Sequence, residues 1–291
     1  MSAPTPGVDP TRLDPYVVVA LEKLAARESA LIALDFDGCL APLVDDPAEA
    51  RPLPEAAAAL EELSTAPDLD LALISGRPAA DLIHLATPPA NTWIIGSHGA
   101  EIGRVDGEGE FHQEDFALDP AEVELLEAVT AQLTEIAGAH ADVWVEHKPA
   151  AAVLHTRQAQ PEVGAAARAA ALTGPGALDG VHPIEGNEVV EIAVVAATKG
   201  KALTKLRADV EGRRGAPVTV LYAGDDVTDE TALATLKFSD VGIKVGHATT
   251  VARFWVTDPP AMAAALRVYV HQRRRRANRA ETATGESAGD R

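Results

Sequence analysis

Short apolar runs, each of strand length, alternate along this chain with segments of helical pattern. Pro54, Pro78 and Thr198 stand at predicted helix starts, because proline suits the first turn of a helix and threonine caps one. The predicted strands are LIALDF at 31–36, LDLALIS at 69–75, NTWIIG at 91–96, VTVLYAG at 218–224 and DVGIKVG at 240–246. Buried strands that alternate with helices predict a parallel sheet covered on both faces. We therefore expect an α/β fold with a doubly wound, Rossmann-like core.

The middle of the chain has a different pattern. Asp119 is a candidate helix cap, and the later runs VWVEHK, AAVLHTR and VVEIAVV mix polar with apolar residues, as half-exposed strands do. We predict an inserted α+β cap domain at 114–195 within a core domain formed by 16–113 and 196–270. The Pro-rich residues 1–15 and the tail 271–291, with its run Arg273–Arg276, are predicted to be disordered.

Charge and composition restrict the partners. A formal net charge of −19 argues against binding to nucleic acid or to an anionic membrane. The N-terminal residues lack the pattern of a signal peptide, no apolar run is long enough to span a bilayer, and a single cysteine, Cys39, suits a reducing compartment. We expect a cytoplasmic monomer that acts on a small molecule.

Polar side chains follow the predicted strands at the edge where ligands of such sheets bind. Asp35 and Asp37 follow the first strand, Ser75 follows the second, Lys199 opens a helix, and Asp225 and Asp229 lie in GDDVTDE after the strand at 218–224. Crowded carboxylates require a cation, and oxygen donors suit Mg²⁺. With Lys199 and Ser75 holding a phosphoryl group, Asp35 could attack phosphorus and Asp37 could serve as general acid and base. The pattern therefore favours phosphoryl transfer.

These segments resemble the motifs of the haloacid dehalogenase superfamily, and DFDGCLAPL, SHGAEI, VEHKPAAAVLHTR, GNEVVEI and GDDVTDE resemble those of the trehalose-6-phosphate phosphatases over roughly 30–258. The resemblance implies Asp35 as nucleophile, Asp37 as acid/base, Ser75 and Lys199 as phosphoryl ligands, and a Mg²⁺ site of Asp35, Asp37 (through its backbone) and Asp225. It implies that Asp229 either lies behind these ligands or is an occasional metal ligand itself. It also implies that Arg157 and Glu191 contact sugar hydroxyls. Cys39 and Asn187 stand where that family usually has threonine and a sugar-binding lysine, and Ala193 and Val194 replace a frequent Arg-Pro.

Some assignments stay open. Arg77 and His98 could line the cleft and bind substrate, or could have structural roles in their loops. For Trp93, Trp144 and Trp255 we expect packing against other residues more than service as a platform for a sugar. The substrate could instead be sucrose phosphate or a mannosyl-glycerate phosphate. A protein of a different class, a switch controlled by aspartate phosphorylation, would use similar strand-end residues, but the predicted insertion and Asp37 speak against it. A catalytically silent binding protein is disfavoured by the presence of all the acidic groups and Lys199.

Overall fold

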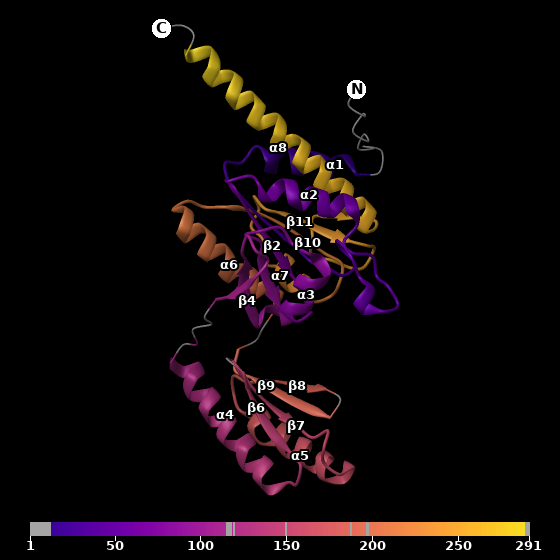
Figure 1. Cartoon of the computed structure of the whole chain (residues 1–291), viewed down its shortest axis with the longest axis vertical. Coiled ribbons are helices and arrows are strands. Elements are labelled where there is room, and N and C mark those ends of the chain that lie inside the picture. The colour runs from indigo at the N-terminus through magenta and orange to yellow at the C-terminus, as the bar shows by residue number, and fades with distance from the viewer. Residues whose placement is uncertain are drawn as a thin grey trace. The chain divides into compact units, whose positions relative to one another are not determined.

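The computed structural model describes residues 13–114, 118, 120–148, 150–186, 188–195 and 198–288, with side chains described as far as Asn278. These residues form two compact units, with the boundaries after Glu114 and before Thr198 (Figure 1). The first unit contains an eight-stranded sheet and the second a four-stranded sheet. Among the described residues, no helix combines the length and the apolar character needed to cross a membrane.

The larger sheet has the order β12-β11-β10-β1-β2-β3-β4-β5. Its strands are β1 (Ala30–Leu34), β2 (Leu69–Ile74), β3 (Trp93–Gly96), β4 (Glu101–Val105), β5 (Phe111–Gln113), β10 (Thr219–Gly224), β11 (Val241–Val245) and β12 (Phe254–Val256). Neighbours from β12 to β3 pair in parallel, which confirms the predicted α/β core. Strands β4 and β5 add an antiparallel edge that the sequence pattern did not predict.

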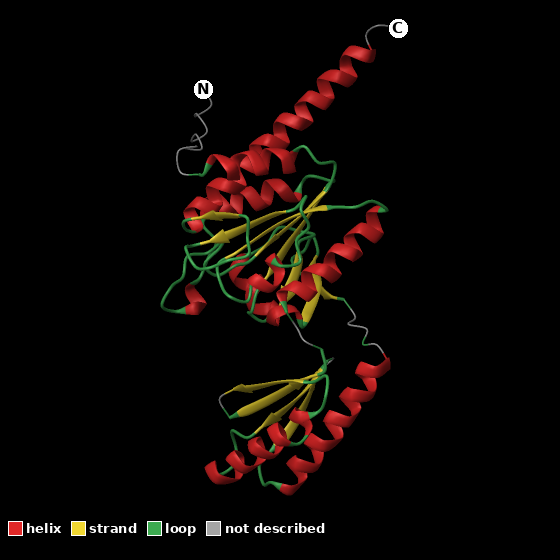
Figure 2. Ribbon diagram, turned by 180° about the vertical axis from the view of Figure 1, so that it is seen from behind, coloured by secondary structure: helices red, strands yellow, loops and turns green. Residues whose placement is uncertain are grey.

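Helices cover both faces of this sheet, and side chains of β1 alternate between the two resulting cores. Ile32 and Leu34 pack on one face with α1 and α8, whereas Leu31 and Ala33 pack on the other with α6. Figures 1 and 2 show α1, α2 and α8 on one side of the sheet and α6 on the other. The helices of this unit are α1 (Pro15–Ala25), α2 (Pro54–Ser64), α3 (Ala79–Ala86), α6 (Lys199–Arg214), α7 (Glu230–Leu233) and α8 (Pro259–Ala288), with short 3₁₀ turns at Pro47–Glu49 and Ser97–Gly99.

The second unit is a four-stranded antiparallel sheet of order β6-β7-β9-β8 with helices on one face. Its elements are α4 (Pro120–Ala139), β6 (Trp144–Lys148), β7 (Ala151–His155), α5 (Pro161–Thr173), a 3₁₀ turn (Pro175–Ala177), β8 (His182–Gly186) and β9 (Val189–Ala193). Leu154 and Ile192 of the sheet pack with Leu133 of α4 and Ala171 of α5. The predicted helix cap Asp119 lies outside the described residues.

Both predicted disordered ends need correction within the described residues. Leu13 is buried, and the carboxylate of Asp14 accepts a hydrogen bond from the backbone of Tyr16 at 2.7 Å, which caps α1. At the other end α8 continues to Ala288. The guanidinium of Arg273 donates to the carbonyl of Arg27 at 2.7 Å, beyond the end of α1, and also pairs with Asp68. These partners lie far away in sequence, so the basic run alone could not reveal them.

Candidate active site

The sheet topology brings the predicted residues to the end of β1. Strand β1 lies between β2 and β10, so the chain runs to one side of β1 and later returns to the other, and such a switch point is where doubly wound sheets bind ligands. Asp35 follows β1, and its backbone N–H donates to the carbonyl of Ala223 in β10 at 2.9 Å. The ends of β1, β2 and β10 therefore place Asp35, Ser75 and Asp225 at one edge of the sheet.

A buried ion pair joins Lys199 to two of the predicted carboxylates. Its Nζ donates to Oδ1 of Asp35 and to Oδ1 of Asp229, each at 2.8 Å. Lys199 is the first residue of α6, whose start is fixed by the Thr198 hydroxyl accepting from the backbone of Lys201 at 3.2 Å. Burial alone would lower the pKa of Lys199, but the charges of Asp35 and Asp229 raise it above its ordinary value. The ammonium group therefore stays charged beside both acids.

Asp229 is held rigidly by its own surroundings. It is fully buried, and it accepts hydrogen bonds from the Tyr222 hydroxyl at 2.6 Å and from the backbone of Asp226 at 2.9 Å. A Cβ on Gly224 would lie 2.2 Å from Cγ of Asp229, so only glycine fits there. Burial raises the pKa of Tyr222, and the Asp229 charge acts in the same direction, so the phenol remains a hydrogen-bond donor. Sequence reasoning missed Tyr222 because it lies in an apolar strand.

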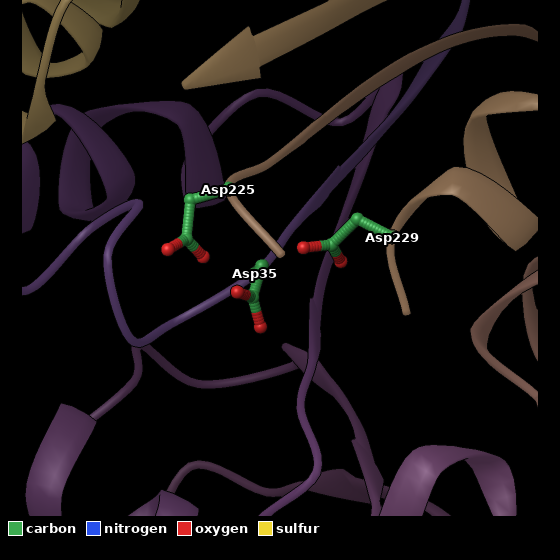
Figure 3. A group of neighbouring side chains, drawn as sticks. All are labelled: Asp35, Asp225 and Asp229. Carbon is green, nitrogen blue, oxygen red and sulfur yellow. The ribbon is translucent and has the colours of Figure 1, made fainter. Parts of the chain in front are cut away.

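Asp35, Asp225 and Asp229 form a group of oxygen donors that could hold a divalent cation (Figure 3). One carboxylate oxygen from each lies within 4.8 Å of the others. Burial raises the pKa of Asp35 and of Asp225, and the charge of Asp229 acts in the same direction on both. A Cβ on Gly38, whose φ is +71°, would lie 2.0 Å from Oδ2 of Asp225, so glycine permits this close approach. An all-oxygen donor set fits Mg²⁺.

The Asp37 side chain lies outside this group of three and pairs with Arg77. The guanidinium donates from Nε to Oδ2 and from its terminal nitrogen to Oδ1, each at 2.6 Å. It also lies over the Phe36 ring, with 5.7 Å from Cζ to the ring centroid. The structure thus places Arg77, a predicted substrate contact, on the predicted acid/base. A metal contact from Asp37 through its backbone stays a prediction.

Ser75 and His98 lie in neighbouring loops that are joined by a backbone hydrogen bond. The Ser75 hydroxyl accepts from the backbone of Arg77 at 3.1 Å, and its carbonyl accepts from the backbone of His98 at 3.0 Å. His98 is exposed, and its ring lies so close to Gly76 that a Cβ there would be 2.6 Å from Cε1. Partial burial of the ring lowers the pKa of His98, and the charge of Lys199 adds to this effect. A neutral His98 ring could donate or accept a hydrogen bond.

The predicted sugar-binding residues belong to the second unit. Glu191 of β9 accepts from Nζ of Lys148 in β6 at 2.7 Å. Arg157 is exposed and forms no hydrogen bond or ion pair with any described residue. Asn187 lies outside the described residues. The contacts of Arg157, Asn187 and Glu191 with a sugar remain predictions.

Lys244 anchors the segment that contains Asp226 and Glu230, and sequence reasoning missed it. It is almost fully buried in β11, and its Nζ donates to the carbonyl of Asp226 at 3.0 Å and to Oε1 of Glu230 at 3.1 Å. Glu230 in turn accepts from the backbone of Val251 at 2.8 Å. The available signal was a lysine within the apolar run VGIKV, since a buried ammonium group requires acidic or carbonyl partners.

Comparison with known proteins accounts for this arrangement. The family model for trehalose-phosphatase matches residues 33–258. The chain belongs to the trehalose-phosphatase family. The trehalose-phosphate phosphatase of Mycobacterium marinum is 36% identical over 221 residues, which cover 74% of this chain and 54% of that protein. The Mycobacterium leprae protein of the same name is 34% identical over 255 residues, covering 82% and 56%. The matched part thus spans just over half of these trehalose-phosphatase relatives.

Solved structures of similarly named proteins share the fold. The trehalose-6-phosphate phosphatase of Aspergillus fumigatus superposes with a TM-score of 0.60 at 22% identity, covering 89% of this chain and 98% of that one. The C-terminal domain of the Candida albicans enzyme gives a TM-score of 0.58 at 21% identity, covering 88% and 97%. At this level of identity the likeness shows a shared fold.

Proposed function

We propose that this chain is a Mg²⁺-dependent phosphatase that hydrolyses trehalose 6-phosphate to trehalose and inorganic phosphate. The observation that carries the proposal is the position of Lys199, whose ammonium group lies 2.8 Å from both Asp35 and Asp229, beside a group of oxygen donors at the switch point of the sheet. Membership of the trehalose-phosphatase family supports the choice of substrate. That the protein is a cytoplasmic monomer stays a prediction.

Asp35 is the proposed nucleophile. One of its carboxylate oxygens bonds to phosphorus, and the bond from phosphorus to the sugar oxygen breaks, leaving the electron pair on that oxygen. The carboxyl group of Asp37 gives its proton to the departing sugar oxygen. Lys199 and Ser75 would bind the phosphoryl oxygens. When bound at Asp35, Asp225 and Asp229, Mg²⁺ would neutralise these carboxylates and the charge on the phosphoryl group.

The second step returns both acids to their starting forms. The carboxylate of Asp37 takes a proton from water, the water oxygen bonds to phosphorus, and the bond from phosphorus to Asp35 breaks. Phosphate leaves with the new oxygen, Asp35 is again a carboxylate, and Asp37 is again protonated. The proximity of Asp35 to Asp37 in the sequence allows one short loop to carry both functions.

A panel of sugar phosphates tests this function. Purified protein with Mg²⁺ should release phosphate faster from trehalose 6-phosphate than from glucose 6-phosphate, sucrose phosphate or a mannosyl-glycerate phosphate. Chelation of the metal should stop release, and Asp35→Asn should abolish it while the folded far-ultraviolet spectrum is kept. Equal rates on glucose 6-phosphate would refute the substrate, and an active Asp35→Asn variant would refute the mechanism.

A further inference from the structure

One face of the four-stranded sheet carries polar and aromatic side chains instead of helices. Strand alternation directs Leu154 and Ile192 to the core formed with α4 and α5. It directs Trp144, His155 and Glu191 to the opposite face, where the pairing register sets His155 directly beside Trp144. Figures 1 and 2 show α4 and α5 together on one side of this sheet.

Trp144 and His155 stack face to face on that side of the sheet, so His155 covers one face of the indole and only its opposite face is available to a ligand. Their ring centroids are 3.9 Å apart and their planes differ by 8°. Nε2 of His155 lies 2.8 Å from a carboxylate oxygen of Glu146, which fixes the orientation of the imidazole. Trp144 keeps 45% of its surface exposed, whereas Trp93, a tryptophan that packs inside the larger unit, keeps 1%. Trp144 thus packs against His155, as expected, and still keeps a large exposed surface whose role the packing leaves open.

The neighbouring side chains complete a surface suited to a sugar ring. Glu146 of β6 and Glu191 of β9 both pair with Val153 of β7, so they occupy the same row on this face. Lys148 donates to Glu191 at 2.7 Å on the same face. Carboxylates and an ammonium group can hydrogen-bond to hydroxyls, while an aromatic face attracts the weakly positive C–H groups of a pyranose. Apolar contact combined with a few fixed polar groups is typical of a small-molecule site.

We propose that a pyranose ring of the substrate stacks on the face of Trp144 that His155 leaves uncovered, and that this contact determines specificity for the disaccharide. This inference rests on the proposed phosphatase function. Trp144 carries no group that takes part in phosphoryl transfer, so its contribution is to binding. The same surface should take up free trehalose, which has the same rings without phosphate.

Steady-state kinetics of Trp144→Ala separate this role from a structural one. We expect KM for trehalose 6-phosphate to rise about tenfold, as loss of one aromatic contact would produce, with kcat nearly unchanged. Trp144→Phe should restore much of the affinity. Hydrolysis of p-nitrophenyl phosphate, which has no sugar, should be unaffected. An unchanged KM, or equal losses on both substrates, would overturn the proposal.

Trp255 provides a matched control in the larger unit. It is 49% exposed and also contacts a histidine, His247, but the rings are tilted by 56° with centroids 5.3 Å apart. Trp255→Ala should leave KM for trehalose 6-phosphate unchanged. A Trp255→Ala effect as large as that of Trp144→Ala would also contradict a specific role for Trp144.

A binding measurement distinguishes failure of this inference from failure of the proposed function. In Trp255→Phe protein, the remaining tryptophans are Trp93, which is buried, and Trp144. Trehalose should change the fluorescence of this protein in a saturable way, and should leave that of the double variant with Trp144→Phe unchanged. If the wild-type protein fails to hydrolyse trehalose 6-phosphate, this titration still tests the stacking surface, and a flat titration would overturn it.

Discussion

The guanidinium group of Arg77 donates two hydrogen bonds, of 2.6 Å each, to the carboxylate of Asp37. Paired in this way, Asp37 is positioned as a carboxylate, the form that would activate water in the second step of the proposed reaction. Proton donation to the sugar oxygen in the first step requires a protonated Asp37, so the ion pair must loosen before that step. We therefore predict that Arg77 acts on the proposed reaction through Asp37.

Replacement of Arg77 by alanine should lower kcat about tenfold or more, because Asp37 loses the contact that orients it. KM for trehalose 6-phosphate should change little. Measurement of both constants decides between this role and direct substrate binding, which would raise KM at nearly constant kcat. Arg51→Ala is the control, since among the described residues that guanidinium hydrogen-bonds only to the backbone carbonyls of Ala48 and Ala50.

Gly38 and Gly109 make a matched pair for testing the approach of Asp225 to the loop. Both have positive φ, +71° and +85°, but an added Cβ would lie 2.0 Å from Asp225 at Gly38 and would meet nothing within 4 Å at Gly109. Each alanine variant should lose about 1 kcal/mol of stability through backbone strain. Only Gly38→Ala should also displace Asp225 and weaken Mg²⁺-dependent activity by at least about tenfold. Equal activity of the two variants would argue against this contact.

Local patterns predicted the residues of the site that stand at strand and helix ends. Asp35, Lys199 and Asp225 are recognisable because polar groups end apolar runs, and parallel strands bring such ends together. Lys244 and Arg273 escaped prediction because their partners are remote in sequence and follow only from the packed fold. Strand alternation could have placed Trp144 on one face of its sheet. The residue that stacks against it, His155, follows only from the register in which β6 pairs with β7.

Glu230 should make stability depend on pH. Burial would raise the pKa of Glu230, but hydrogen bonds from Val251, Lys244 and Thr250 lower it below the ordinary value. A carboxylate with a lowered pKa stabilises the fold above its unfolded pKa, and this stabilisation is lost as the pH falls through the folded value. Glu230→Gln should therefore be less stable than wild type at pH 7, with the difference shrinking below about pH 5.

Denaturant unfolding at neutral and acidic pH measures this difference. Glu28→Gln is the control, because Glu28 is exposed and the change should leave the unfolding free energy the same at both pH values. If the difference in unfolding free energy between wild type and Glu230→Gln stays constant down to pH 3, the assigned role of the carboxylate is contradicted.

The contacts of α8 with the rest of the larger unit should contribute to stability. Arg273→Ala removes hydrogen bonds to the carbonyls of Ala25 and Arg27 and the pair with Asp68, and should cost about 1 kcal/mol of unfolding free energy. Arg275 is exposed, so Arg275→Ala should cost much less. Phosphatase activity should be unchanged in both. Identical stabilities of the two variants would favour the disordered tail that the sequence pattern predicted.

Trapping the phosphoryl group on the protein tests the central claim most directly. Protein mixed with excess trehalose 6-phosphate and Mg²⁺ should be quenched in acid within one turnover, digested, and analysed by mass spectrometry. We predict one added phosphoryl group on the peptide that contains Asp35, absent from Asp35→Asn protein and much reduced in Lys199→Met protein. A phosphoryl group on another residue, or full labelling of the Asp35→Asn protein, would contradict the account.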